Sequence, residues 1–436
     1  MSSAIHTSAS TTQIIRPARS LRGSLMLPGD KSISHRYAML AGFAEGTSLL
    51  TNFSTGADPH SSLACMQAMG AKVSLDGKTI SVTGTGGALK HPKGDLDCGN
   101  SGSTMRMLAG LVAAQHGTFR FVGDESLTVR PMERIRKPLE MMGAHIDLTD
   151  GHAPMTVHGR KLKAIDFETP IASAQVKTAV LFAGLQAEGM TSIAERVRTR
   201  DHSEHALRAF GAKLERKGDR LSIAGGQKLH AIDATVPGDM SSAAFFLCAA
   251  LLFEDSNLVL DALGMNPTRA AMLDVISAMG GVVKVLDMQE QHGEMAGTIQ
   301  VNRGRELRGI DISGALAAQL IDELPVIAAI APYTTHGVKI RDARELRVKE
   351  SDRIALVVKN LRAMGAEVTE HEDGMDVPGG QTLHGGVIDS GLDHRIAMAF
   401  SIAALRAEGE TEIHGAEAAG ISFPEFFDWL GELAIR

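Results

Sequence analysis

The hydrophobic residues of this chain follow one plan that recurs about every seventy residues. An Ala-rich apolar run with helical spacing ends at a glycine and is followed by a strand-like run that contains Thr. A glycine directly after a periodic apolar run is typical of a helix C-terminus. The copies lie at 41–46, 109–117, 183–189 and 403–409, with looser copies ending near Asp255 and at Gly337.

The pattern indicates a second helix between successive copies. Each second helix ends at a Met-Gly or Phe-Gly step, and two short alternating runs joined by a polar turn follow, as at 72–75 and 79–82. Such alternation predicts a β-hairpin. The steps lie at Met69-Gly70, Met142-Gly143, Phe210-Gly211, Met279-Gly280 and Met364-Gly365, with Leu430-Gly431 as the sixth. The predicted unit is therefore βαβαββ, and six units cover nearly the whole chain.

A larger duplication divides the six units into two groups. Pro28-Gly29-Asp30 recurs near the middle of the chain as Pro237-Gly238-Asp239. We therefore predict an α/β fold with an N-terminal domain at 28–237 and a C-terminal domain at 238–436, each of three repeats. The last unit lacks its hairpin, so residues 1–27 are expected to be a tail and a segment that completes the C-terminal domain. A chain that crosses twice between domains is suited to hinge motion.

Composition narrows the classes of function. At 436 residues the chain is long enough for two domains. Its 44 Lys and Arg against 51 Asp and Glu give a formal charge of -7, which disfavours nucleic-acid and anionic-membrane binding. The apolar run at 240–253 is too short to span a bilayer. Three widely spaced cysteines favour neither a disulfide framework nor a zinc site, and they suit a reducing compartment, so we expect a cytoplasmic location.

The starts of the six first helices carry different polar residues. Ser, Asn and Asp are ordinary N-caps, and Asp30 or Ser32 can cap the first helix. Cations there oppose the helix dipole and need an anionic partner. The residues that capping does not explain are Lys31, Arg36, Arg106, Gln175 and Arg395. The set therefore predicts an anion-binding site built from helix N-termini.

The second helices add further cations near their starts. These are Arg130, Arg200, Lys349 and Arg353, and Pro131 is expected at a first helical position. A single surface Arg is more often solvated than functional, but equivalent positions in several repeats favour a site. Asp322 and Glu350 stand among these cations, and the residues alone support capping and acid–base chemistry equally.

Other motifs are less informative. His202 and His205 are spaced as two metal ligands could be, but a third ligand is not evident and a surface helix is the better interpretation. The glycines at 84–87 fit a turn, since no helix follows to complete a dinucleotide site. Neither a phosphate-binding Gly-x4-Gly-Lys loop nor a Gly-x-Ser-x-Gly elbow occurs, which excludes the corresponding hydrolases.

Seven motifs, taken together, resemble the EPSP synthase (3-phosphoshikimate 1-carboxyvinyltransferase) family from about Ile14 to the C-terminus. They are Pro-Gly-Asp-Lys-Ser-Ile-Ser-His-Arg at 28–36, Gly-Asn-Ser-Gly-Ser-Thr-Met-Arg at 99–106, Arg-Pro-Met at 130–132, Ser-Ala-Gln-Val-Lys at 173–177, Asp-Glu-Leu-Pro at 322–325, Leu-Arg-Val-Lys-Glu-Ser-Asp-Arg at 346–353 and Asp-His-Arg-Ile-Ala-Met at 393–398. The resemblance implies two domains of three βαβαββ units with helix N-termini facing the interdomain cleft. It also implies transfer of the enolpyruvyl group of phosphoenolpyruvate to the 5-hydroxyl of shikimate 3-phosphate, without metal or other cofactor.

The resemblance also implies roles for single residues. Lys31, Asp322 and Glu350 are the expected catalytic residues: Lys31 protonates the leaving phosphate, Asp322 orients or deprotonates the hydroxyl, and Glu350 protonates the methylene carbon. Residues expected to bind shikimate 3-phosphate are Lys31, Ser32, Arg36, Ser173, Ala174, Gln175, Arg200, Asp322 and Lys349. Those expected to bind phosphoenolpyruvate are Lys31, Asn100, Gly102, Arg130, Gln175, Arg353 and Arg395. We expect a monomer.

The sequence leaves open two alternatives to the EPSP synthase reaction. UDP-N-acetylglucosamine enolpyruvyl transferase shares the fold, but it has Lys-Asn where this chain has Lys31-Ser32 and usually a cysteine in the loop at 122–130. A non-catalytic relative that only binds phosphorylated ligands is the other. Ser-Ala-Gln at 173–175 resembles the second of the two EPSP synthase classes, and Ile421 stands where the first class has a lysine.

Overall fold

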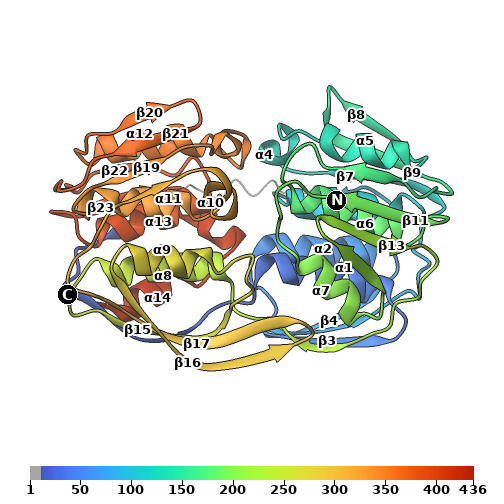
Figure 1. Ribbon diagram of the computed structural model, residues 1–436, viewed down its shortest axis with the longest axis horizontal. Helices are drawn as coiled ribbons and strands as arrows, with labels where there is room; N and C mark the ends of the chain where they lie inside the picture. Colours follow the sequence, from blue (N-terminus) through green and yellow to red (C-terminus); the bar gives the residue numbers. More distant parts are fainter. Residues whose placement is uncertain (1–10) are drawn as a thin grey trace, which may run out of the picture.

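The protein is described here by a computed structural model, which covers residues 11–436. It has an N-terminal half and a C-terminal half, drawn on the right and on the left of Figure 1. Six small sheets are present in this part of the chain, three in each half. The predicted α/β fold with repeated units is therefore confirmed. The tail predicted at the start of the chain falls mainly on residues outside the described range.

The N-terminal half contains three units that share one plan. In each, a first helix leads to a strand and a second helix leads to a hairpin. The first unit is α1 (Lys31–Phe43), β3 (Thr47–Thr51), α2 (Ala57–Ala68), β4 (Lys72–Asp76) and β5 (Thr79–Thr83). The second is β6 (Leu96–Asp97), α3 (Gly102–Val112), β7 (Gly117–Val122), α4 (Glu125–Thr128), α5 (Glu133–Met141), β8 (His145–Thr149) and β9 (His152–Gly159). The third is β10 (Asp166–Glu168), α6 (Ala174–Gly184), β11 (Met190–Ala194), α7 (His202–Ala209), β12 (Leu214–Lys217) and β13 (Arg220–Ala224).

The C-terminal half repeats the plan with local changes. Its first unit is α8 (Met240–Leu251), β15 (Asn257–Gly264), α9 (Ala271–Ala278), β16 (Gly281–Gln291) and β17 (Glu294–Arg303). The next is β18 (Ile310–Ile312), α10 (Gly314–Gln319), α11 (Leu324–Ile330), η1 (Ala331–Tyr333), β19 (Val338–Ile340), η2 (Arg344–Val348), α12 (Arg353–Ala363), β20 (Thr369–His371) and β21 (Gly374–Val377). The last is β22 (Val387–Asp389), α13 (His394–Ala404), β23 (Thr411–His414), η3 (Ala416–Ile421) and α14 (Phe426–Leu433), and β24 (Ala434–Ile435) ends the chain.

The two halves exchange strands where the chain crosses between them. β1 (Thr12–Ile15) pairs with β23, and β2 (Ser20–Met26) pairs in parallel with β15. In return, β14 (Asp233–Thr235) pairs in parallel with β3. The two Pro-Gly-Asp segments lie against each other at the crossing: the Asp30 N–H donates to the carbonyl of Pro237, and the Asp239 N–H donates to that of Pro28. This arrangement supports our proposal of domains at 28–237 and 238–436, with 1–27 joined to the second.

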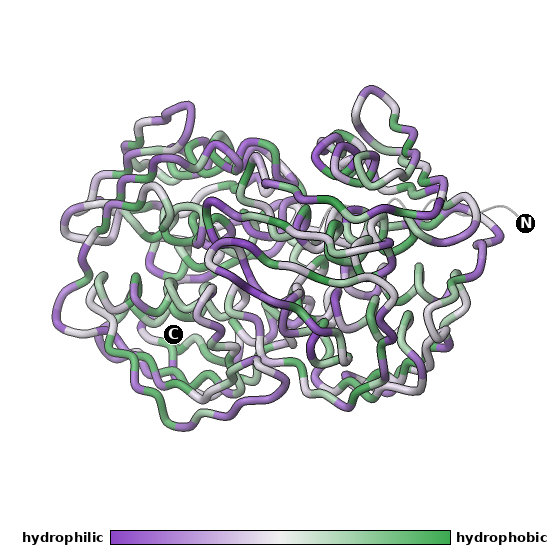
Figure 2. The backbone as a smooth tube through the Cα atoms, turned by 45° about the vertical axis from the view of Figure 1, so that its right-hand side comes forward, coloured by the Kyte–Doolittle hydropathy of each residue, from purple (hydrophilic) through white to green (hydrophobic). Residues whose placement is uncertain are grey.

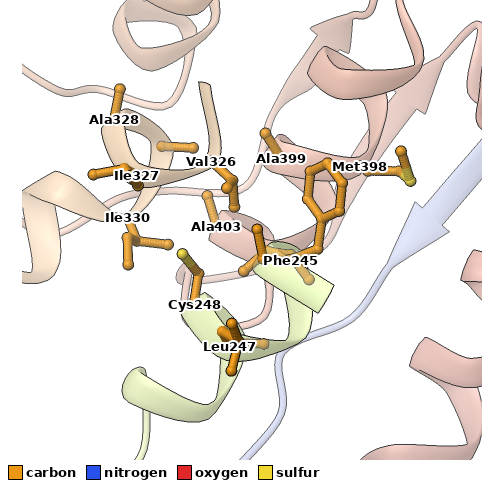
Figure 3. Close-up of a cluster of buried hydrophobic side chains, with 14 of the residues drawn as sticks. Phe245, Leu247, Cys248, Val326, Ile327, Ala328, Ile330, Met398, Ala399 and Ala403 are labelled. Carbon is orange, nitrogen blue, oxygen red and sulfur yellow. The ribbon is translucent and has the colours of Figure 1, made fainter. Parts of the chain in front are cut away.

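The apolar residues form two separate cores, one in each half. In the C-terminal half the first helices α8, α11 and α13 meet side by side, with Phe245, Ile327 and Met398 among the contacts (Figure 3). Each fully buried side chain of this size contributes roughly 1.5–3 kcal/mol relative to an exposed one. Hydrophilic segments lie toward the outside, notably in the hairpins (Figure 2). Within residues 11–436, we find that every helix is too short or too polar to cross a lipid bilayer.

Side-chain caps fix where most of the first helices begin. Asp30, Ser101, Ser173, Asp239 and Asp393 each accept a hydrogen bond from a backbone N–H in the first turn of the helix that follows. A cap that satisfies one backbone donor leaves other first-turn N–H groups free. The caps therefore define where each helix presents its positive end.

Three local expectations are wrong. Pro131 does not stand at a first helical position: α5 begins at Glu133, and the Met132 N–H donates to the carbonyl of Gly151, which holds the segment before the helix against the turn between β8 and β9. The fifth unit has an additional short helix, α10, before α11. The helix with His202 is not simply a surface helix, since that side chain is buried and its Nδ1 lies 2.7 Å from Glu294 Oε1.

Candidate active site

A cleft with a cavity volume of about 360 Å³ lies between the two halves. Residues at or directly before the first turn of all six first helices line it. These are Lys31 and Ser32 at α1, Gly102 and Ser103 at α3, Ser173 to Gln175 at α6, Asp239 and Ser241 at α8, Ile321 and Asp322 before α11, and His394 and Arg395 at α13. The segments before three of the second helices add Arg130, Arg198 to Arg200, and Lys349 with Glu350. The repeats therefore turn their helix N-termini toward one shared space.

Nearly all the site residues predicted from the sequence line this cleft. They are Lys31, Ser32, Arg36, Gly102, Arg130, Ser173, Ala174, Gln175, Arg200, Asp322, Lys349, Glu350, Arg353 and Arg395. Asn100 does not. Its side-chain oxygen and its backbone carbonyl accept hydrogen bonds of 2.8 and 3.1 Å from the Arg130 guanidinium. Asn100 therefore holds Arg130 in place from behind.

The cleft is strongly cationic although the whole chain is acidic. Among the residues that the structure describes, ten Lys and Arg side chains and six carboxylates line it, a surplus of four positive charges, against -7 for the chain. Low-dielectric walls concentrate such a field. The local charge therefore favours ligands with several negative charges.

Two buried arginines lack a carboxylate partner among the described residues. Arg36 donates to the hydroxyls of Ser203 and Thr178 and to the carbonyl of Ser32. Arg106 donates to the side chain of Gln175 and to the carbonyl of Pro131. Burial lowers the pKa of Arg36 to about 10 and, together with neighbouring arginines, that of Arg106 to about 9. Both cations would be stabilised by an anion in the cleft.

Lys31 has a partner that the sequence did not indicate. Its ammonium lies 2.5 Å from a carboxylate oxygen of Asp58, and both side chains are largely buried. Burial raises the pKa of Asp58 above its usual value, against the effect of the nearby ammonium. Asp58 belongs to α2, which packs on α1, so only tertiary structure brings the pair together.

Within residues 11–436, three ion pairs between cleft residues join one half to the other. Arg200 lies 2.6 Å from Asp322, and Arg134 lies 2.8 Å from Glu345. A longer contact of 3.6 Å joins Arg130 to Glu350. Because each pair uses one residue from each half, bringing the halves together also assembles the site.

Asp322 and Glu350 lie among cations. Burial alone would raise both pKa values, but nearby cations outweigh it and hold both well below the usual range. The cations that act on Asp322 are Lys349, Arg395, Arg200 and Arg353, and those that act on Glu350 include Arg353, Arg130 and Lys31. Both groups are therefore carboxylates in the ligand-free protein.

His394 is a further polar side chain at the cleft. It is buried, and neither ring nitrogen has a hydrogen-bond partner among the described residues. Burial, with Lys31 and Arg395 nearby, lowers its pKa to about 3. His394 is therefore neutral near pH 7 and can donate or accept one hydrogen bond toward a ligand.

Several lining residues were outside the predicted site. Asp58, Arg134, Glu345 and His394 line the cleft, as does Arg106, which the sequence marked only as a cation that needs a partner. The position of Arg106 near a helix start was the available signal. Asp58 and Glu345 carried no comparable signal, because each meets its cation from another element.

Four of the six carboxylates that line the cleft are poorly placed to hold a metal. Asp58, Asp322, Glu345 and Glu350 each pair with a Lys or Arg side chain, which satisfies their negative charge. A divalent cation would have to displace these partners. The site suits anionic organic ligands better.

Two three-unit halves whose helix N-termini and arginines share one cleft define the class of the enolpyruvyl transferases. The sequence model of the family described as "EPSP synthase (3-phosphoshikimate 1-carboxyvinyltransferase)" matches residues 15–430. The chain belongs to this family.

Individual relatives agree with the family match. A 3-phosphoshikimate 1-carboxyvinyltransferase of Koribacter versatilis is 60% identical over 423 residues, covering 97% of this chain and 99% of the relative. The protein with the same name from Synechococcus sp. is 46% identical over 98% of each chain. A solved EPSP synthase structure from Acinetobacter baumannii superposes with a TM-score of 0.86 at 39% identity, covering 98% and 99% of the two chains.

Proposed function

We propose that this protein transfers the enolpyruvyl group of phosphoenolpyruvate to the 5-hydroxyl of shikimate 3-phosphate and releases phosphate. The observation that carries the proposal is the cationic interdomain cleft formed by six helix N-termini, in a chain that belongs to the EPSP synthase family. Two anions that repel each other must meet for this reaction. The surplus of positive charge in the cleft offsets that repulsion, and the surrounding side chains orient the reactants.

Shikimate 3-phosphate is proposed to bind mainly to the N-terminal half. Arg36, whose hydrogen-bond partners within residues 11–436 are all neutral, and Arg200 supply charge for its phosphate. The starts of α1 and α6 present Ser32, Ser173, Ala174 and Gln175 to the same region, with Lys31 beside them. Asp322 and Lys349 reach this ligand from the opposite half.

Phosphoenolpyruvate is proposed to bind between Arg130 on one side and Arg353 and Arg395 on the other. Gly102 leaves room for it: an added Cβ would lie 2.9 Å from the Arg106 guanidinium and 3.6 Å from that of Arg130. Asn100 contributes by fixing Arg130, and Lys31 and Gln175 lie where the two ligands meet.

The proton transfers follow from the charges around each group. Asp322 is ionised and can accept the proton of the attacking hydroxyl as its oxygen bonds to C2 of phosphoenolpyruvate. Glu350 must gain a proton before it can protonate the C3 methylene. The negative groups of phosphoenolpyruvate offset Arg130 and Arg353, and so they raise the pKa of Glu350. In the second step phosphate leaves C2 with a proton from Lys31, and Glu350 takes back the methyl proton. The proton that Asp322 took from the hydroxyl then replaces the one that Lys31 has lost, so the net change is transfer of the hydroxyl proton to phosphate.

We further propose a monomer in the cytoplasm. Residues from both halves of one chain line the cleft, so a second copy is not needed to complete it. Cys65, Cys98 and Cys248 are buried free thiols, which suits a reducing compartment. Light scattering coupled to size exclusion tests the first point, and cell fractionation tests the second.

The decisive experiment measures phosphate release from phosphoenolpyruvate with two acceptors side by side. We expect turnover with shikimate 3-phosphate and background release with UDP-N-acetylglucosamine. Product identity should be checked by mass spectrometry. Turnover with the nucleotide sugar instead would assign the protein to the related enzyme, and no turnover with either acceptor would indicate a binding protein.

A further inference from the structure

A second cluster of ionisable side chains lies outside the cleft, on the β8–β9 hairpin of the second unit. His145 and Asp147 of β8 and His158 of β9 each offer one ligand atom, and these atoms all lie within 4.8 Å of one another. The residues do not line the cleft. We propose that this cluster is a binding site for a divalent transition-metal ion of the zinc type.

The register of the sheet places the three side chains on one face. His145 lies directly opposite His158, and Asp147 is two residues further along β8, so it points to the same side. The alternate residues Ile146 and Val157 are buried in the core, which keeps the three polar side chains on the solvent face. Rigid paired strands are a suitable base for metal ligands because they fix the ligand spacing.

The ligand atoms already converge. His158 Nε2 lies 2.7 Å from Asp147 Oδ2, and His145 Nε2 lies 3.3 Å from Asp147 Oδ1. The imidazole rings stack with centroids 5.1 Å apart. In tetrahedral zinc sites the donor atoms are roughly 3.3 Å apart, as bonds of about 2.0–2.1 Å require. Small side-chain rotations therefore suffice to place one ion among the three atoms.

A neighbouring hydroxyl orients one of the histidines. Thr118 on β7 lies opposite His158, and its Oγ1 is 3.3 Å from His158 Nδ1. A hydrogen bond at Nδ1 directs Nε2 toward Asp147, as a partner on the far ring nitrogen commonly does for a histidine that binds a metal. Two imidazoles and one carboxylate leave a further position for water, and they favour zinc, cobalt, nickel or copper over magnesium and calcium.

The test uses tag-free protein treated with chelator, titrated with zinc by calorimetry. We expect one zinc ion per chain with micromolar affinity, a rise in Tm of a few degrees, and no heat with magnesium. Asp147→Asn, His145→Gln and His158→Ala should each weaken zinc binding at least tenfold. His336→Ala, which removes an exposed histidine of the C-terminal half, should bind like the wild type.

A spectroscopic readout separates a metal site from a simple ion-pair cluster. Cobalt added to the chelated wild type should give the visible absorption of a tetrahedral complex, and the three variants should lose it. Equal Tm values in chelator would show that the variants fold. Zinc binding that persists in all three variants, or no binding by the wild type at millimolar zinc, would overturn the proposal.

Discussion

Glu350 lies where its state of ionisation depends on the arginines around it. Its carboxylate is 2.5 Å from Arg353 and 3.6 Å from Arg130, and their effect outweighs burial. In the proposed reaction Glu350 takes up a proton and then gives it to carbon. This requires that the pKa of Glu350 rises when phosphoenolpyruvate binds. The side chain is therefore more than an ion-pair partner in the proposed reaction.

We predict that Glu350→Gln lowers kcat by about 10²-fold or more, because the amide cannot transfer the proton to the methylene carbon. Ligand binding should change less, since the size of the side chain is kept. Phosphate release under saturating substrates measures the effect. Glu372→Gln removes an exposed carboxylate paired with Arg344 and serves as the matched control. A kcat within a factor of three of the wild type would refute the role of Glu350.

The ionisation of Asp322 should make the stability of the protein depend on pH. Cations hold its pKa below the usual value, so its contribution to stability is present above the ordinary carboxyl pKa of about 3.9 and is lost as the pH falls through the folded-state pKa. Asp322→Asn should therefore lower Tm near pH 7, at a cost of about 1–3 kcal/mol for the lost charged contacts. The difference in Tm should shrink as the pH falls below about 4.

Thermal unfolding of both proteins between pH 7 and pH 3.5 measures this difference. The exposed Asp311 provides a control, since Asp311→Asn should leave Tm nearly unchanged at neutral pH. A Tm difference for Asp322→Asn that stays constant to pH 3.5 would contradict the stated cause.

A single residue of the site could be predicted where its neighbours in the sequence mark it, and not where only tertiary packing brings it to the site. Lys31 and Arg395 stand at capped helix starts, where a cation opposes the helix dipole, so the sequence alone marks them. Asp58 carries no such mark, since it meets Lys31 only when α2 packs on α1. Asn100 was predicted to line the ligand pocket, but its contact with Arg130 places it behind that guanidinium.

At the level of helices and strands, the repeat could be recognised in the sequence because the glycines that end its helices directly follow those helices in the chain. Glycines such as Gly70 and Gly143 adopt positive φ directly after the second helices, which a residue with a side chain rarely does. The start of α5 was misplaced because a long-range hydrogen bond from Met132 to Gly151 sets it, and no pattern within the helix reveals that contact.

The crossing segments allow a test with two equivalent glycines. A Cβ on Gly29 would lie 1.9 Å from the carbonyl oxygen of Asn52, whereas on Gly238 the nearest atom would be the carbonyl oxygen of Ala262 at 3.1 Å. We predict that Gly29→Ala destabilises the protein by about 1–3 kcal/mol and that Gly238→Ala costs clearly less. Urea unfolding of the two variants and the wild type measures the order, and the reverse order would contradict this account of the crossing.

For the whole molecule, the duplicated Pro-Gly-Asp motif in the sequence predicted two groups of three units. The sequence did not indicate which strands pair in the exchange between the two halves. β14 has only three residues, and its pairing with β3 depends on chain segments about 180 residues apart. The cationic character of the cleft could not be read from net charge, because its surplus is local while the chain as a whole is acidic.

That surplus also predicts how the two halves respond to ligands. Seven of the ten cations but only one of the six carboxylates belong to the N-terminal half, so ion pairs such as Arg200 with Asp322 draw the two walls together and leave positive charge on the N-terminal wall without a partner. Two anionic substrates bind to this unpaired charge and also contact Lys349, Arg353 and Arg395 of the other wall, so they join the two halves, and the double crossing provides a hinge. We therefore predict that the radius of gyration falls toward about 22 Å, the value for a compact chain of this length, when both substrates are added. Small-angle X-ray scattering measures the change. Phosphoenolpyruvate with UDP-N-acetylglucosamine should leave the profile unchanged, and the same profile with and without the proposed substrates would rule out ligand-driven closure.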